Sequence, residues 1–416
     1  MYSLKIEGKK TLKGEIKTPG DKSISHRAVM LGSIAKGETI IKNILLSEDT
    51  LRTIECFREM GVDIVIDDKE NILKINGNGI HGLKKPFKPL DCGNSGTTMR
   101  LLAGILVGQN FSSTLIGDIS LSKRPMDRII IPLTKMGANI KGYNDKYPPI
   151  SIEPSNELRG IKYELPMASA QVKSAILLAS IYSKGETKVI EKKITRDHTE
   201  KMLEYFGKDK FMGKEIYVPG DISSAAFFIV AATIMEGSSI TIKDVGINST
   251  RTGIIDVIKA MGGNIKIDNV RSINNEPIGD IYISYAPIKG IELDKNIIGR
   301  LIDEIPIIAV AAAFAEGTTV IKNAEELKYK ETDRIQAMVN EMKKMGADIE
   351  ALPDGLIIHG KKELSPAIVN TYGDHRIAMA LSIASLNIKG MSKIQNSQCI
   401  NISYPGFYET ILGLLE

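Results

Sequence analysis

The feature that most constrains the fold of this chain is an internal repeat. Six alanine-rich apolar segments recur along the 416 residues, and each runs into a glycine. The segments are residues 28–37, 99–108, 174–185, 224–237, 305–317 and 377–390. A short run with strand composition follows five of the six glycines directly, and after Gly108 it begins a few residues later. Six ordered copies predict one supersecondary unit repeated six times.

A second, amphipathic helix is expected after each of these strands. In four units it ends on the phrase Met-Gly-x-(Asp or Asn)-Ile, whose glycines are Gly61, Gly137, Gly262 and Gly346. In a fifth unit, the one that begins with residues 174–185, Phe206-Gly207 takes the same place. Glycine there fits the left-handed residue that follows many helices, and the isoleucine is expected to begin the next strand. Before Met345, the apolar residues recur at helical spacing and predict one buried face, made by Ile335, Met338, Val339 and Met342.

The six units divide into two halves of three, which predicts two domains. A chain of 416 residues also exceeds the usual size of a single core. Pro19-Gly20-Asp21 and Pro219-Gly220-Asp221 occupy matching places ahead of the first apolar segment of each half. We expect the chain to cross between domains there, so that residues 20–218 form an inserted domain. Residues 1–19 and 219–416 would then form a discontinuous one.

The composition is that of a soluble globular protein, with 43% hydrophobic and 25% charged residues. A dispersed net charge of +4 argues against nucleic acid as a partner, and no apolar run is long enough to span a membrane. The N-terminus alternates like a strand and lacks the apolar core of a signal peptide. Cys56, Cys92 and Cys399 are too widely spaced to indicate a disulfide framework or a zinc site. We therefore expect a cytoplasmic protein.

The beginnings of the apolar segments gather cations, hydroxyls and amides. They are residues 21–27, 93–100, 168–174, 221–224, 303–306 and 373–376. A helix start carries free N–H groups and a partial positive charge, which favour bound anions, although Ser, Asp and Asn there can also be plain N-caps. Gly93 and Gly96 flank small polar residues, which favours close approach of a ligand to the backbone.

Two more cationic stretches, residues 122–125 and 328–334, begin amphipathic helices. Together these donors predict a small substrate pair that carries several negative charges. Asp303, Glu331 and His375 are candidate proton carriers among them. A repeat scaffold that binds anionic partners without catalysis is the alternative, because repeats of this kind can be purely structural.

Several of these motifs resemble those of the enolpyruvyl transferases, and among them the members that act on 3-phosphoshikimate. The motifs are Pro-Gly-Asp-Lys-Ser-Ile-Ser-His-Arg (19–27), Gly-Asn-Ser-Gly-Thr (93–97), Lys-Arg-Pro-Met (123–126), Lys-Glu-Thr-Asp-Arg (330–334) and Asp-His-Arg (374–376). The resemblance covers essentially the whole chain. It implies an α/β (α+β) fold of two similar domains, each made of three βαβαββ repeats packed as an α-β prism and joined by two crossover strands, with the ligands between the domains.

The resemblance also implies a reaction. The enolpyruvyl group of phosphoenolpyruvate would pass to the 5-hydroxyl of 3-phosphoshikimate through a tetrahedral intermediate, with release of phosphate. It implies no metal and no organic cofactor, no partners beyond the two small substrates, and a monomer.

Particular residues acquire roles by the same resemblance. The residues expected to hold 3-phosphoshikimate are Lys22, Ser23, Arg27, Ser169, Ala170, Gln171, Thr195, Asp303 and Lys330. Those expected to hold phosphoenolpyruvate are Lys22, Asn94, Gly96, Arg124, Gln171, Arg334 and Arg376. Asp303 would take the proton from the attacking hydroxyl, Glu331 and Lys22 would serve protonation of the methylene carbon, and His375 completes the catalytic set.

Three positions depart from patterns common in that family. Ala170 replaces a serine, so only its backbone could contact phosphate. Glu326 stands where some members have asparagine, and Ile402 where some have a lysine that binds phosphoenolpyruvate. The site is therefore expected to have one cation fewer, or a substitute for that lysine that the sequence does not identify.

Two related enzymes are the rival interpretations. The transferase that acts on UDP-N-acetylglucosamine expects Lys-Asn at Lys22-Ser23 and a cysteine between Leu115 and Ser120, and this chain has neither. RNA 3'-phosphate cyclase would need a nucleotide-accepting histidine in a different C-terminal context.

Overall fold

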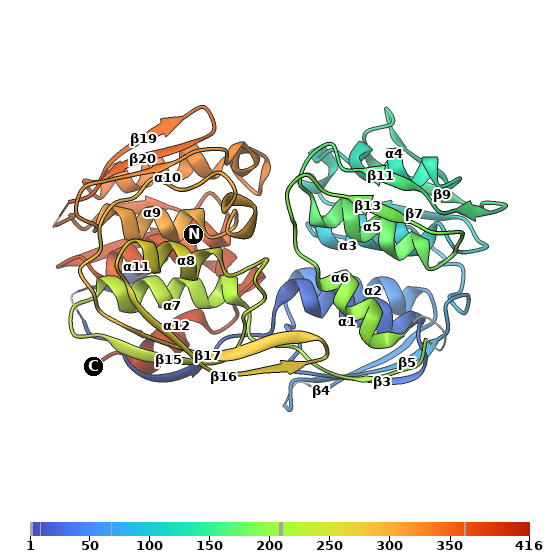
Figure 1. Cartoon of the computed structure of the whole chain (residues 1–416), viewed down its shortest axis with the longest axis horizontal. Coiled ribbons are helices and arrows are strands. Elements are labelled where there is room, and N and C mark those ends of the chain that lie inside the picture. The colour runs from blue at the N-terminus through green and yellow to red at the C-terminus, as the bar shows by residue number, and fades with distance from the viewer. Residues whose placement is uncertain (1–2, 9, 68, 208–210, 362) are drawn as a thin grey trace. The chain divides into compact units, whose positions relative to one another are not determined.

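The computed structural model describes the chain except residues 1–2, 9, 68, 208–210 and 362. It folds into two compact units (Figure 1). The N-unit comprises Gly20–Val218 and Ile273–Glu276, and the C-unit comprises Met1–Pro19, Pro219–Ser272 and Pro277–Glu416. Each unit has its own hydrophobic core.

Among its described residues, the N-unit contains three core helices, three outer helices and one short 3₁₀ helix. The core helices are α1 (Lys22–Ile34), α3 (Gly96–Leu106) and α5 (Ala170–Ser180); the outer ones are α2 (Glu48–Glu59), α4 (Asp127–Lys135) and α6 (His198–Phe206), and the 3₁₀ helix is η1 (Leu121–Lys123). One sheet has the order β14 (Glu215–Tyr217), β3 (Lys36–Lys42), β5 (Ile72–Asn78), β4 (Asp63–Asp67). A second has the order β6 (Leu90–Asp91), β7 (Ser113–Ile116), β9 (Tyr147–Glu153), β8 (Asn139–Tyr143). Two parallel pairs complete it, β10 (Leu158–Arg159) with β12 (Ser183–Lys184) and β11 (Lys162–Glu164) with β13 (Lys188–Ile190).

The C-unit repeats this plan. Its core helices are α7 (Ile222–Ile234), α9 (Ile305–Ala313) and α11 (His375–Leu386), and its outer helices are α8 (Gly253–Ala260), α10 (Arg334–Lys344) and α12 (Phe407–Leu414). The 3₁₀ helices are η2 (Ile298–Arg300), η3 (Glu325–Tyr329) and η4 (Ser397–Ile402). The sheets have the orders β16 (Asn264–Ile273), β17 (Glu276–Ser284), β15 (Ser239–Gly246), β2 (Lys13–Lys17); β18 (Thr318–Ile321), β20 (Gly355–His359), β19 (Asp348–Leu352); and β1 (Ser3–Glu7), β22 (Met391–Gln395), β21 (Ile368–Asn370).

Strand pairing shows the repeat directly. In the second N-unit sheet, β6 runs parallel to β7 across α3, and β8 and β9 then form an antiparallel hairpin beside β7. The same order recurs in the sheet of β3, and in the sheet of β15 the parallel neighbour β2 and the antiparallel neighbour β17 take the same places. The βαβαββ repeat and the α/β class are thereby confirmed.

Two strands each pair within one unit although the chain continues directly into the other unit. β2 precedes α1 of the N-unit, yet it pairs with β15 of the C-unit sheet. β14 precedes α7 of the C-unit, yet it pairs with β3 of the N-unit sheet. Each unit is therefore completed by a strand from the chain segment that leads into the other.

The apolar segments form buried helices, as their composition requires. All residues of α7 and α9 are buried, because they have no polar face to present to water. In the view of Figure 1, α7 and α9 lie between the sheet of β19 and β20 and the sheet of β15, β16 and β17. The face predicted for α10 is confirmed, since Ile335, Met338, Val339 and Met342 are all buried. No described helix is long and apolar enough to cross a membrane.

The glycines that end the apolar segments have two different physical reasons. Gly37, Gly185, Gly237, Gly317 and Gly390 all have positive φ, which glycine tolerates best. Gly108 does not have positive φ. A Cβ there would lie 2.1 Å from the ring of Tyr182, so glycine is needed to leave room for that ring. The glycines of the Met-Gly phrases also have positive φ, as predicted, although the following strands begin at the Asp or Asn one residue earlier than expected.

Candidate active site

Five of the six core helices begin with a capped N-terminus. The capping side chains, each accepting a bond from a backbone N–H of the first turn, are Asp21, Ser95, Ser169, Asp221 and Asp374. The N-cap interpretation thus holds for these residues. Helix α9 differs, because Glu304 stands at its cap position and makes no side-chain cap bond. Asp303 lies one residue further out, and so it is not the N-cap of α9.

In the N-unit, the loop before α3 gathers several predicted phosphoenolpyruvate residues. Asn94 Oδ1 accepts a 2.7 Å hydrogen bond from Arg124 Nη2. A Cβ on Gly96 would lie 2.9 Å from Arg100 Nη1 and 3.5 Å from Arg124 Nη1. Two guanidiniums therefore flank the glycine at the start of a helix, an arrangement suited to an anion.

Gln171 joins this group through two hydrogen bonds. Its Oε1 accepts from Arg100 Nη1 at 2.6 Å, and its Nε2 donates to Thr97 Oγ1 at 3.0 Å. The structure thus brings Asn94, Gly96, Arg124 and Gln171 together. Sequence reasoning assigned no role to Arg100, although it stands within the polar start of α3; its place one helical turn after Gly96 was the available signal.

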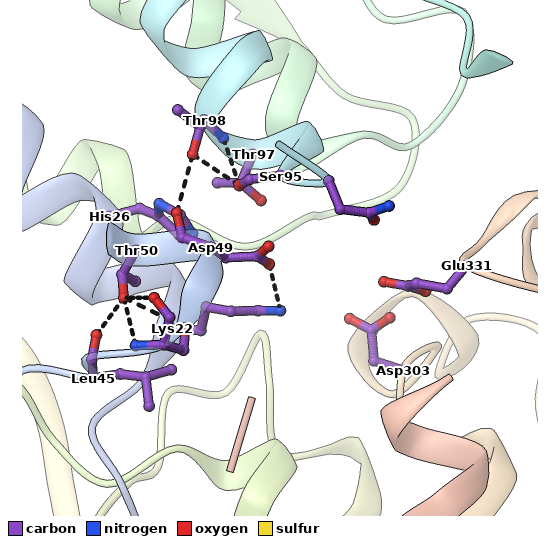
Figure 2. A network of polar contacts seen from close by, with 12 residues as sticks. Lys22, His26, Leu45, Asp49, Thr50, Ser95, Thr97, Thr98, Asp303 and Glu331 are labelled. Carbon is purple, nitrogen blue, oxygen red and sulfur yellow. Dashed lines mark hydrogen bonds and ion pairs between the residues drawn. The ribbon is translucent and has the colours of Figure 1, made fainter. Parts of the chain in front are cut away.

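Lys22 is held by a partner that the sequence did not single out. Its Nζ lies 3.1 Å from Asp49 Oδ2 on α2, and Figure 2 shows the ammonium directed at that carboxylate. Thr98 Oγ1 lies 3.4 Å from the backbone oxygen of Asp49 and 2.8 Å from Ser95 Oγ, within hydrogen-bonding distance of both (Figure 2). These bonds connect the starts of α1, α2 and α3.

Arg27 and Thr195, both predicted 3-phosphoshikimate residues, have protein partners in this structure. The buried guanidinium of Arg27 donates to Thr199 Oγ1, the Ser23 carbonyl and Ser174 Oγ. Burial lowers the pKa of Arg27 to about 10. The hydroxyl of Thr195 donates to the carboxylate of Glu191. Ser169 and Ala170 lie at the start of α5, where Ala170 offers backbone only.

In the C-unit, Arg334 is surrounded by carboxylates. Its Nε lies 2.8 Å from Asp374 Oδ2, Nη2 lies 2.6 Å from Glu331 Oε2, and Nη1 lies 3.4 Å from Asp303 Oδ1. Its side chain is only 2% exposed. Burial alone would lower the pKa of Arg334, but these three carboxylates raise it above its ordinary value.

Lys330 is a second cation beside Asp303. Its Nζ lies 3.5 Å from Asp303 Oδ1 and 2.9 Å from Glu326 Oε1. Burial opposes the charge of Lys330, and Asp303 and Glu326 outweigh it, so the pKa of the lysine is raised. The side chain of Asp303 stays 16% exposed between Lys330 and Arg334. Glu326 is thus a partner of Lys330 in this structure.

Arg376, His375 and Ile402 are the remaining positions of the C-unit that the sequence singled out. Arg376 Nη1 donates to the backbone oxygen of Asp303 at 3.2 Å. His375 is buried at the start of α11, and its catalytic role stays a prediction. Ile402 ends η4 and packs against the hydrophobic core of the C-unit. Across the described residues, no group of three His, Cys, Asp or Glu side chains is arranged to hold a metal ion.

Comparison with known proteins identifies the family. The sequence profile of EPSP synthase (3-phosphoshikimate 1-carboxyvinyltransferase) matches residues 6–411. The 3-phosphoshikimate 1-carboxyvinyltransferases of Thermoanaerobacter sp. (strain X514) and Bacillus pumilus (strain SAFR-032) are each 52% identical; the alignments cover 98% of this chain and 99% and 98% of theirs. The crystal structure of EPSP synthase from Acinetobacter baumannii is 45% identical, with a TM-score of 0.90 over 99% of this chain and 98% of that one. The enolpyruvyl transferase NikO from Streptomyces tendae shares the fold, with a TM-score of 0.79 at 16% identity over 100% of this chain and 98% of that one. With nearly the whole chain matched and relatives at about half identity, this protein belongs to the EPSP synthase family.

Proposed function

We propose that this chain transfers the enolpyruvyl group of phosphoenolpyruvate to the 5-hydroxyl of 3-phosphoshikimate, with Asp303 as the proton acceptor. The observation that carries the residue assignment is the position of Asp303. It lies outside the cap of α9, partly exposed, with two cations within 3.5 Å of its Oδ1. Neighbouring cations favour the ionised form of a carboxylate, which is the form that accepts a proton.

The proposed reaction is an addition followed by an elimination. Asp303 takes the proton of the 5-hydroxyl, and the oxygen attacks the central carbon of phosphoenolpyruvate. Glu331 and Lys22 serve the protonation of the methylene carbon, which gives a tetrahedral intermediate. Loss of a proton from the methyl carbon and departure of phosphate then restore the carbon–carbon double bond as an enol ether.

The arginines supply the grip on phosphoenolpyruvate in this proposal. Arg124 and Arg376 present planar guanidiniums that suit paired hydrogen bonds to carboxylate or phosphate. Support comes from the position of Arg124 beside Gly96 and of Arg376 in the first turn of α11. Arg334 is expected to serve phosphoenolpyruvate as well, and Arg100 joins the set through Gln171.

The starts of α1 and α5 are proposed to hold 3-phosphoshikimate, together with Lys330 of the C-unit. Ser23, Ser169 and the backbone of Ala170 lie in or beside the first turns of those helices, where N–H groups favour phosphate. Thr195 and Arg27 complete the set. We propose that these two substrates are the partners of the chain and that it acts as a monomer.

Phosphate release tests the proposal. Phosphate should appear from phosphoenolpyruvate only when 3-phosphoshikimate is also present. Phosphate release that does not depend on 3-phosphoshikimate would contradict the assigned reaction.

The Asp303→Asn variant tests the base. Asparagine keeps the size of the side chain and an acceptor oxygen for Arg334 but cannot take up the proton. We expect turnover to fall roughly 10²- to 10⁴-fold. Melting temperature and 3-phosphoshikimate binding, measured by calorimetry, should stay near wild type. Full turnover in this variant would remove Asp303 from the mechanism and make Glu331 the next residue to test.

A further inference from the structure

A series of buried polar contacts in the C-unit leads from Arg251 to Arg376. Arg251, in the loop before α8, has its Nη2 2.8 Å from Ser223 Oγ and 3.2 Å from Asp221 Oδ1. The Ser223 hydroxyl donates in turn to Glu304 Oε1. The same carboxylate oxygen lies 3.7 Å from Arg376 Nη1. Because Ser223, Glu304 and Arg376 stand at the starts of α7, α9 and α11, the contacts tie these three helix ends together.

The burial of Glu304 calls for an explanation. Its side chain is 1% exposed, and a carboxylate removed from water is strongly destabilising unless cations or hydrogen bonds compensate. Arg251 donates a hydrogen bond to Ser223, and the Ser223 hydroxyl donates to the Glu304 carboxylate. Arg376 faces the same carboxylate directly. The mechanism proposed above gives Glu304 no role, and its carboxylate would repel an anionic substrate rather than bind it.

The geometry around Arg376 suggests what the carboxylate does. Nη1 of Arg376 is committed to the C-unit, because it donates to the Asp303 backbone oxygen and faces Glu304. Its Nε and Nη2 make no hydrogen bond to any described residue. Arg334 contrasts with it, since all three of its side-chain nitrogens contact carboxylates. One edge of the Arg376 guanidinium is therefore anchored, and the other edge is available to a ligand.

We propose that Glu304 is a positioning residue that fixes the guanidinium of Arg376 in the orientation that binds phosphoenolpyruvate. This inference rests on the proposed role of Arg376 in holding that substrate. Glu304 acts through Arg376, and Ser223 and Arg251 hold Glu304 in turn. A guanidinium fixed before the ligand arrives loses less conformational freedom on binding, which strengthens binding of the ligand.

The first test is the Glu304→Gln variant. Glutamine fills the same space and can still accept the Ser223 hydrogen bond, but it presents no charge to Arg376. We expect KM for phosphoenolpyruvate to rise roughly tenfold, the size expected for one charge-assisted contact. KM for 3-phosphoshikimate should stay unchanged.

Glu341→Gln is the matched control. Glu341 is a fully buried carboxylate on α10 of the same unit, and it pairs with Lys344 and accepts from the Tyr372 hydroxyl and Asn370 N–H. Loss of the Glu341 charge should lower the melting temperature and leave both KM values unchanged. If Glu304→Gln behaves like this control, its role is merely structural and the inference is overturned.

A double-mutant cycle tests whether the effect passes through Arg376. The Glu304→Gln effect on KM for phosphoenolpyruvate should largely vanish in an Arg376→Lys background, because the fork that it orients is gone. It should persist in an Arg124→Lys background, since Arg124 belongs to the N-unit, where its guanidinium bonds Asn94. Full additivity with Arg376→Lys would overturn the positioning role.

Two further outcomes separate the inference from the function on which it rests. If Arg376→Lys leaves KM for phosphoenolpyruvate unchanged, the proposed role of Arg376 itself fails. If Arg376→Lys raises that KM and Glu304→Gln does not, only the Glu304 inference fails. Should Glu304→Gln not fold, Ser223→Ala removes the hydroxyl that holds the carboxylate; a smaller rise in the same KM would support the inference, and an unchanged value would overturn it.

Discussion

Arg334 and Arg376 differ in how far the protein itself satisfies them. Arg334 touches three carboxylates and is almost fully buried. An anionic substrate that reaches it has to compete with Glu331, whose carboxylate lies 2.6 Å from Nη2. Arg376 has only one edge of its fork engaged. The two arginines have the same predicted role, but Arg376 has more N–H groups left to donate to a ligand than Arg334.

His26 is a residue whose burial makes stability depend on pH. It lies fully buried on α1, with Nδ1 2.7 Å from Thr53 Oγ1. Burial lowers the pKa of His26 from 6.5 to about 3, although Asp49 acts in the opposite direction. Below pH 6.5 the unfolded chain binds a proton that the folded chain refuses, so the stabilising contribution is lost as pH falls from 6.5 toward 3.

The His26→Gln variant isolates this effect, because glutamine can still bond Thr53 but does not titrate. Between pH 6 and pH 4 the free energy of unfolding of the wild type should fall faster than that of the variant, by about 1.4 kcal/mol per pH unit. Urea unfolding at several pH values measures both slopes. Parallel slopes would show that His26 does not contribute to acid sensitivity.

At the scale of elements, the glycines after the core helices make a testable pair. Gly37 has φ +90° and nothing within 4 Å of a built Cβ, so only its backbone conformation resists substitution. Gly108 has no positive φ, and the Tyr182 ring occupies the place of its Cβ. The same sequence signal thus covers two physical constraints.

Asparagine and alanine distinguish these constraints. At Gly37, alanine should destabilise by about 1 kcal/mol and asparagine by less, since asparagine tolerates left-handed backbone better. At Gly108, both should destabilise by about 1–3 kcal/mol, because any side chain displaces Tyr182. Urea unfolding of the four variants measures this. An advantage of asparagine at position 108 equal to that at position 37 would contradict the packing explanation.

At the scale of the whole molecule, the pairing of β2 within the C-unit and of β14 within the N-unit decides which segments can fold together. We propose that the N-unit and the C-unit are the two domains. The N-terminal segment completes the C-unit through β1 against β22, β2 against β15, and the fully buried Leu12. Deletion of residues 1–19 should therefore leave residues 20–218 folded. In the C-unit, it should expose the edges of β15 and β22 and part of the hydrophobic core to water. Amide hydrogen exchange should show protection kept in the N-unit and lost from β15 and β22.

A circular permutant provides the control for this deletion. It begins at Gly20 and carries residues 1–19 on a flexible linker after Glu416. All strand pairs can then form, and protection in the C-unit should return. Equal loss of protection in both units after deletion would show that they do not fold as separate domains.

The proposed substrate binding also makes a prediction for the whole molecule. Phosphoenolpyruvate gripped by Arg124 of the N-unit and Arg376 of the C-unit would require the two units to meet around it. We expect the radius of gyration from small-angle scattering to decrease when both substrates are added. An unchanged radius would contradict joint binding by the two units.

The sequence by itself determined the local features of this protein. The apolar segments, the amphipathic face of α10 and the positive-φ glycines follow from side-chain periodicity and backbone sterics, which act within a few residues. The family motifs likewise marked the helix starts where Lys22, Gly96 and Arg376 lie.

Only the tertiary structure decided the contacts between distant segments. Asp49 with Lys22, Arg100 with Gln171, and Glu304 with Arg376 join residues whose separation along the chain carries no periodic signal. The pairing of β2 with β15 belongs to the same class, because any strand edge offers the same backbone hydrogen bonds. The partner of each strand and buried charge is chosen by how the whole chain packs, and that choice is not encoded in its neighbours along the sequence.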